Sequence, residues 1–232
     1  MSDTALFRRN AAAVGLIAAP ILAAASRFLY QPSGGNKPAD LLTALHDAHG
    51  RAVASTVLFV LYALPFMVAA FGIGHLLRGR SAKLSNIGVA FAIVGGFCDA
   101  VASSFTLVYT QMAQDVTHRD AHIAVIDQAN KIEGLFSIVG ALGTVVGILL
   151  LSIGLFRSHI GPRWVAPLLW VFLILEFVGS TISASLGLVA VTIALIAYWA
   201  LAITVWQSPR VAWETAEPYR TLTQDAAPTV PA

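Results

Sequence analysis

Charged side chains are scarce in this sequence. Asp, Glu, Lys and Arg make up 11% of the 232 residues, whereas hydrophobic residues make up 57%. A water-soluble domain carries about 25% charged residues. The scarcity excludes an ordinary soluble domain and indicates that lipid surrounds most of the chain. The formal net charge is only +2, and the basic residues are scattered, which argues against a nucleic-acid partner.

The sequence has a single cysteine and none of the common catalytic motifs. The single cysteine, Cys98, excludes an intrachain disulfide framework and a cysteine-based metal cluster. Its simplest interpretation is a small buried hydrophobe. The sequence has no Gly-rich phosphate loop, no nucleophile elbow and no His-Glu-x-x-His helix. The sequence leaves the cofactor unknown, and it does not decide whether the protein is an enzyme.

Six apolar runs are each close to the length of a membrane-spanning helix, which needs roughly 20 residues. They cover residues 11–30, 53–77, 84–112, 135–156, 164–179 and 185–206. The predicted fold is therefore all-α, a polytopic transmembrane helical bundle over 11–206. Residues 1–10 are predicted as a cytoplasmic N-terminus and 207–232 as a mobile cytoplasmic tail. The first run also resembles a cleavable signal peptide, but we interpret it as a retained span.

The basic residues predict the orientation of this bundle. Six spans place both termini on one side, and nine of the 14 Lys and Arg residues fall on that side, against five on the other. The positive-inside rule makes the first side cytoplasmic. We therefore expect a multi-pass protein of a bacterial plasma membrane, whose main partner is the lipid bilayer.

Two carboxylates lie inside the predicted spans. With a rise of about 1.5 Å per residue, Asp99 lies roughly 22 Å and Glu176 roughly 18 Å from the cytoplasmic end of its helix. Both depths fall within an apolar core about 30 Å thick. A serine follows each acid by one turn, Ser103 and Ser180. Arg27, about 24 Å along the first span, lies at a matching depth and is the predicted partner of Asp99.

Intramembrane charges mark functional sites or structural bridges. A carboxylate at mid-membrane costs at least about 2.5–3.5 kcal/mol, so it faces the interior, pairs or stays protonated. One interpretation is a proton, cation or ligand site formed by Asp99, Glu176, Arg27, Ser103 and Ser180. The alternative is an Arg27–Asp99 bridge that fixes the bundle, with Glu176 neutral and hydrogen-bonded locally.

Histidines cluster in the two larger polar loops, 31–51 and 113–132, each of which is expected to hold a short interfacial helix. His46 and His49 are three residues apart, and His118 and His122 are four apart, so each pair shares a helix face. Such spacing suits metal ligation. If the loops met, they could bind zinc or form a pH-sensitive lid. The alternative is two solvated loops with incidental histidines.

Glycines of the fourth span predict close helix packing. They line one narrow face, which lets another backbone approach. These are Gly140, Gly143, Gly147 and Gly154. In addition, 58–99 and 133–179 share the order helix, Arg, basic turn, helix, carboxylate. This order suggests a parallel hairpin repeat of spans 2–3 and 4–5, against the alternative of chance similarity in hydropathy.

Three segments of the sequence resemble those of a known group of membrane proteins. They are the Arg8-Arg9 start before an Ala-rich span, the elbow GHLLRGRSAKLSNIG over 74–88, and GLFRSHIGPRWVAPLLW over 154–170. Across residues 10–206 the chain resembles the small six-span membrane proteins of unknown function that are common in actinobacteria. The resemblance implies fold and location, and it brings no activity or site residues.

Three functions remain open at this point. The first is a protein that binds or moves a small or lipophilic ligand in an intramembrane cavity near Asp99 and Glu176. The second is a non-catalytic accessory subunit of a larger membrane complex, with a protein partner or a second copy. The third is an intramembrane enzyme that modifies a lipid or isoprenoid, with Glu176 as a buried general acid.

Overall fold

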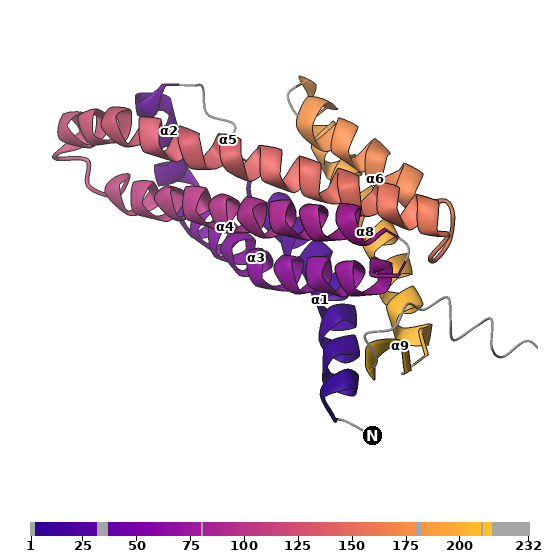
Figure 1. Ribbon diagram of the computed structural model, residues 1–232. Helices are drawn as coiled ribbons and strands as arrows, with labels where there is room; N and C mark the ends of the chain where they lie inside the picture. Colours follow the sequence, from indigo (N-terminus) through magenta and orange to yellow (C-terminus); the bar gives the residue numbers. More distant parts are fainter. Residues whose placement is uncertain (1–2, 32–36, 80, 180–181, 210, 215–232) are drawn as a thin grey trace, which may run out of the picture.

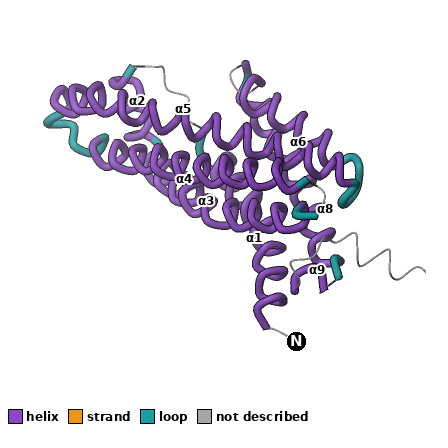
Figure 2. Tube along the Cα trace, in the orientation of Figure 1, coloured by secondary structure: helices purple, strands orange, loops and turns teal. Residues whose placement is uncertain are grey.

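The computed structural model describes residues 3–31, 37–79, 81–179, 182–209 and 211–214, and these residues form helices joined by short loops (Figures 1 and 2). The described part contains no strand. Its elements are α1 (Asp3–Leu29), α2 (Pro38–Asp47), α3 (His49–Leu77), α4 (Ala82–Met112), α5 (Arg119–Ser158), α6 (Val165–Ile174), the π-helical segment η1 (Leu175–Gly179), α8 (Ala184–Gln207) and α9 (Val211–Glu214).

Five helices are long and apolar enough to cross a membrane: α1, α3, α4, α5 and α8. This confirms the all-α, multi-pass character of the predicted bundle. The remaining predicted span corresponds to α6 and η1, a shorter apolar helix over Val165–Gly179. At about 1.5 Å per residue it is roughly 22 Å long, less than the apolar core of a bilayer. Six complete crossings therefore remain a prediction.

α5 differs from the sequence prediction. A short loop helix and a separate fourth span were expected, but a single helix of 40 residues runs from Arg119 to Ser158. The only helix breaker between the two expected helices is Gly134, which a helix tolerates at a cost of about 1 kcal/mol. At about 1.5 Å per residue α5 is roughly 60 Å long. Its first turns therefore extend beyond the bundle, beside α2 and the end of α4 (Figure 1).

The six apolar helical elements form a closed ring. α1 packs against α3, α3 against α4, α4 against α5, α5 against α6, and α6 against α8, which packs back against α1. Consecutive apolar helices are thus neighbours in space, as short connections favour. The main apolar core lies inside the ring. A second core, at the α2 end, is formed by Leu42, Leu45, Ala52, Tyr109, Ala113 and Ile126.

All four glycines predicted to pack closely lie against the backbone or side chains of neighbouring helices. A Cβ atom on Gly143 would lie 2.7 Å from the Cα atom of Gly95, so here the backbones of α5 and α4 touch. A Cβ atom on Gly147 would lie 2.8 Å from the Cα atom of Ala92, also in α4. Gly154 faces α3 instead. Glycine thus allows the close approach that packing in lipid requires.

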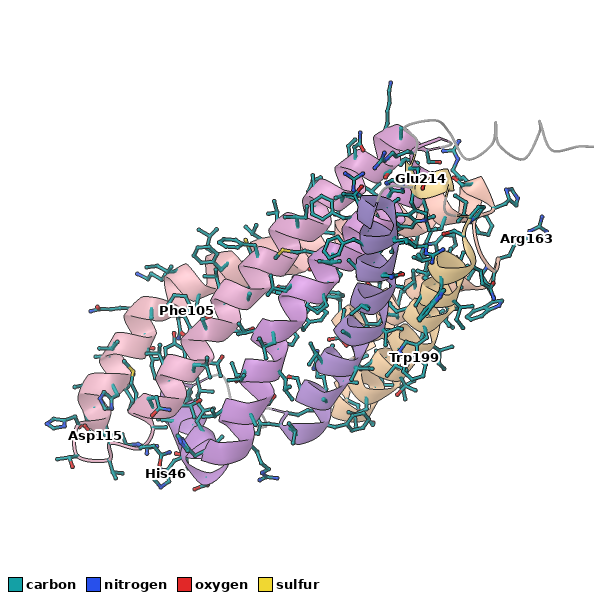
Figure 3. The ribbon with its side chains drawn as sticks, turned by 90° about the horizontal axis from the view of Figure 1, so that it is seen from below. His46, Phe105, Asp115, Arg163, Trp199 and Glu214 are labelled. Carbon is teal, nitrogen blue, oxygen red and sulfur yellow. The ribbon has the colours of Figure 1, made fainter. Side chains whose placement is uncertain are left out.

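The chain after α8 folds back onto the start of α1. Trp213 of α9 is buried in the same core as Ala5, and its ring stacks on His75 at the end of α3, with centroids 4.4 Å apart. The folded domain therefore extends at both ends beyond the predicted boundaries of 11 and 206. In Figure 3, Glu214 and Arg163 lie at one end of the bundle, and His46 and Asp115 lie at the other.

The two halves compared as a hairpin repeat have different structures. α3 and α4 contain 29 and 31 residues, whereas α5 contains 40 and α6 only 10 before it continues into η1. Asp99 lies in regular α-helix, but Glu176 lies in the π-helical segment. The hairpin repeat therefore remains a prediction, and the unequal helix lengths do not support it.

Candidate functional site

A cavity lies inside the ring, and all six apolar elements line it. Its volume is about 100 Å³. One buried water needs roughly 10–15 Å³ of the volume that is open to a water-sized sphere. The cavity therefore has room for several waters or a small ligand group. Its polar lining residues each come from a different helical element: Arg27, Tyr62, Asp99, Thr144, Glu176 and Tyr198. The remaining lining is apolar.

Arg27 and Glu176 form an ion pair across this cavity. Arg27 lies in the last turn of α1, and its Nη2 atom donates a hydrogen bond to Oε1 of Glu176 in η1. The side chains are 32% and 15% exposed, so the pair is largely shielded from solvent. The predicted Arg27–Asp99 bridge is wrong. Depth in the membrane placed both Asp99 and Glu176 within reach of Arg27. However, α1 packs between α3 and α8, and the side chain of Arg27 turns toward η1, which carries Glu176.

Asp99 is held by α5 instead. Its Oδ2 atom accepts a hydrogen bond of 2.9 Å from the hydroxyl of Thr144. Its Oδ1 atom lies against Gly140, one turn earlier on α5, where a Cβ atom would overlap the carboxylate. Gly140 therefore makes room for a polar side chain. Ser103, predicted to share the site, donates a hydrogen bond of 2.8 Å to the backbone carbonyl of Asp99.

Ser180, the other predicted serine, lies outside the described residues. Glu176 itself lies in the π-helical turn between α6 and that position. Such π-helical segments occur frequently at functional sites, because the widened turn redirects a side chain without ending the helix. The change from α to π geometry thus accompanies the placement of Glu176 in the cavity.

Sequence reasoning missed three polar residues of the cavity: Thr144, Tyr62 and Tyr198. A signal was present for the tyrosines, because Tyr in membrane helices favours the two interfaces, whereas these two lie near mid-span. Together with three phenylalanines they give the cavity an aromatic wall. The five rings belong to Phe59, Tyr62, Phe172, Phe177 and Tyr198.

A second, wider hollow opens at the α2 end of the bundle, and we call it the vestibule. It has a volume of about 780 Å³ and lies between the end of α1, α2, the start of α3 and Leu188 of α8. Asp40, Asp47 and Arg51 line it. Arg27 lines both the vestibule and the central cavity. The ion pair of Arg27 therefore lies where the two spaces adjoin.

The four loop histidines do not share one site, and two of them make hydrogen bonds to other groups. His46 donates from Nδ1 to the carbonyl of Ala113, over 2.9 Å, and thereby ties α2 to the end of α4. His118 bonds to the carboxylate of Asp115, also over 2.9 Å, which lowers the pKa of that carboxyl below its usual range. His49 starts α3 and His122 lies in the first turn of α5. Within the described ranges no three His, Cys, Asp or Glu residues are placed to hold a metal ion.

The helices and their polar centre define the class of this protein. A bundle with five long apolar helices, whose intramembrane charges face a common interior, is a multi-pass membrane protein. The chain belongs to the family described as a domain of unknown function, DUF4386, whose model matches residues 11–213. That match ends at Trp213, the residue that packs α9 onto the bundle. Neither the curated proteins nor the solved structures gave a match to this chain.

Proposed function

We propose that this protein binds a small ligand inside the membrane, in the cavity that Asp99 and Glu176 both line. The supporting observation is the arrangement of the polar groups. Six polar side chains from separate helices converge on one space of about 100 Å³. Intramembrane polar groups are costly unless they pair or serve a site. A bundle that needed only packing would fill this space with apolar side chains.

The ion pair of Arg27 and Glu176 supports a route for the ligand. The pair separates the cavity from the vestibule, so a ligand that arrives through the vestibule passes Arg27 first. Opening requires only that one long side chain rotate away from its partner. We propose that the pair closes the cavity, and that the vestibule faces the extracytoplasmic side of a bacterial plasma membrane, with the termini cytoplasmic.

Native mass spectrometry in a mild detergent tests the binding proposal. We expect an adduct of discrete mass on the wild-type protein, reduced at least tenfold in Asp99→Asn. The control Asp127→Asn makes the same change on the exposed surface of α5 and should retain the adduct. A wild-type spectrum without any adduct, from protein extracted directly from its native membrane, would contradict the proposal.

Thiol labelling tests the route. In a Cys98→Ala background, Ala194→Cys places a thiol in the cavity wall, and a charged thiol reagent reports its accessibility. We expect Glu176→Gln to raise the labelling rate several-fold because Arg27 loses its partner. The exposed control Ala121→Cys should label equally with and without that change. An unchanged rate at Ala194→Cys would show that the pair is not the barrier.

No specific observation favours either of the two alternative functions. An accessory subunit that only packs against a partner needs no interior cavity, whereas a cavity lies at the centre of the ring. A lipid-modifying enzyme would use Glu176 as a general acid, but Glu176 is engaged by Arg27. A second polypeptide in the native mass spectrum would favour the accessory subunit over the ligand-binding protein.

A further inference from the structure

The charges around the cavity do not balance. Arg27 and Glu176 neutralise each other, and Asp99 remains with a hydroxyl as its polar partner. The ion pairs among the described residues are Arg27–Glu176 and the surface pair His118–Asp115, so Asp99 belongs to neither. Among the lining residues, Arg27 is the single cationic side chain. An ionised Asp99 therefore leaves the cavity with one uncompensated negative charge, in surroundings where such a charge is strongly disfavoured.

The same cavity has an aromatic wall. Five rings line it, from α3 (Phe59 and Tyr62), from α6 and η1 (Phe172 and Phe177) and from α8 (Tyr198). The faces of aromatic rings attract cations, and aromatic walls are a recurrent way to bind ammonium groups. A carboxylate and an aromatic wall around one small space favour the same kind of ligand, one with a positive charge and an apolar surface.

Other ligand classes fit this lining less well. A hard metal ion takes six or more oxygen ligands, and no group of three acidic or histidine ligands occurs in the described residues. An anion would meet an arginine that is already neutralised, and it would also meet the charge of Asp99. A neutral lipophilic molecule would leave an ionised Asp99 without a counter-charge.

We propose that the cavity binds a small organic cation, an alkylammonium group that Asp99 neutralises and the five aromatic rings enclose. This rests on the proposed function, because it names the ligand class of the same cavity. Thr144 and Gly140 are positioning residues: Thr144 orients the carboxylate by its hydrogen bond, and Gly140 leaves the space in which the carboxylate lies. The volume of about 100 Å³ limits the bound group to a few heavy atoms.

Three probes of similar shape and different charge test this inference. Choline is cationic, 3,3-dimethyl-1-butanol is its neutral isostere, and 3,3-dimethylbutanoate is a related anion. Isothermal titration calorimetry on the detergent-purified full chain measures binding of each. We expect choline to bind at least tenfold more tightly than the alcohol, a difference of about 1.4 kcal/mol, and the anion to bind more weakly than both.

Variants assign the preference to Asp99. Asp99→Asn should remove the preference for choline while the alcohol still binds, and the exposed control Asp127→Asn should keep the preference. Thr144→Val, which retains the charge, should reduce the preference without abolishing it, and it serves as the second variant if Asp99→Asn does not fold. The comparison of the three probes on the wild-type protein needs no variant.

Two outcomes would overturn the inference. The first is equal binding of choline and the alcohol, or a preference that survives Asp99→Asn. The second is no binding of choline at all. Neither outcome decides the proposed function, which the native mass spectrum tests separately: an adduct that proves neutral or anionic would keep the binding proposal and refute the organic cation.

Discussion

The substitution Gly140→Ala tests the structural basis of the site without removing any charge. A Cβ atom at this position would overlap Oδ1 of Asp99 and would lie 3.0 Å from both its Cγ atom and its backbone nitrogen. The backbone of α4 cannot move freely, because Gly95 and Gly143 are in contact a little further along the same pair of helices. The carboxylate must therefore move away from Thr144, or the two helices must separate.

The magnitude follows from three contributions. Overpacking a closely packed site costs about 1–3 kcal/mol. Loss of the hydrogen bond from Thr144 to an ionised Asp99 costs about 1.5–3 kcal/mol. Replacing glycine by alanine in a helix returns about 1 kcal/mol. We therefore expect Gly140→Ala to lower the free energy of unfolding by roughly 1.5–5 kcal/mol.

Gly134→Ala is the matched control on the same helix. A Cβ atom at Gly134 meets nothing within 4 Å, so this change should give the helix gain alone, about 1 kcal/mol. For a chain of this size 1 kcal/mol shifts the midpoint of thermal unfolding by about 2–4 °C. Melting curves in detergent, followed by size-exclusion chromatography, should place Gly140→Ala at least about 5 °C below Gly134→Ala. Equal midpoints for the two variants would refute the packing of Asp99 against α5.

Three further predictions concern other contacts. The effects of Arg27→Gln and Glu176→Gln on the free energy of unfolding should add up to more than the effect of the double variant. The difference, which is the coupling energy of a double-mutant cycle, should be about 1–3 kcal/mol; additive effects would show that the pair does not form. Gly95→Val should lower the free energy of unfolding by at least about 1–3 kcal/mol, measured by thermal melts, because its Cβ atom would lie 2.7 Å from the carbonyl carbon of the facing glycine on α5. The Asp115 carboxyl should titrate below its usual 3.8 in NMR spectra and return toward it in His118→Ala; because its pKa is depressed in the folded protein, the contribution of this contact is present above the usual pKa and lost as pH falls through the lowered one. An NMR titration midpoint of Asp115 that stays at its wild-type value in His118→Ala would contradict that contact.

Much of the architecture could be predicted from hydropathy alone. Five of the six apolar runs are long helices that could cross a membrane, because a run of this length in lipid has to satisfy its backbone within itself. The boundaries between a loop helix and a span could not be predicted in the same way. α5 continues from Arg119 through Gly134 because nothing in that stretch ends a helix, and hydropathy marks where lipid begins rather than where hydrogen bonding stops.

The polar residues of the cavity could be identified from the sequence, but their contacts could not. Asp99, Glu176 and Arg27 could be identified from the sequence, because a charge within an apolar run is visible without a structure. Their pairing could not, since depth along a helix gives one coordinate and the partner depends on which face of which neighbour each side chain meets. Gly140 was predicted to admit another backbone, and its neighbour is the carboxylate of Asp99.

By itself the sequence determined the solvent of this chain, the positions of its apolar runs and the place of each charge within its run, because each of these depends on composition and on spacing along one segment. Only the tertiary structure decided that six helical elements close into a ring, that Arg27 reaches Glu176, and that Thr144, Tyr62 and Tyr198 complete the cavity. These features depend on how each helix is rotated about its axis. That rotation is set by the close contacts of glycine and alanine between helices, which no single run of residues contains.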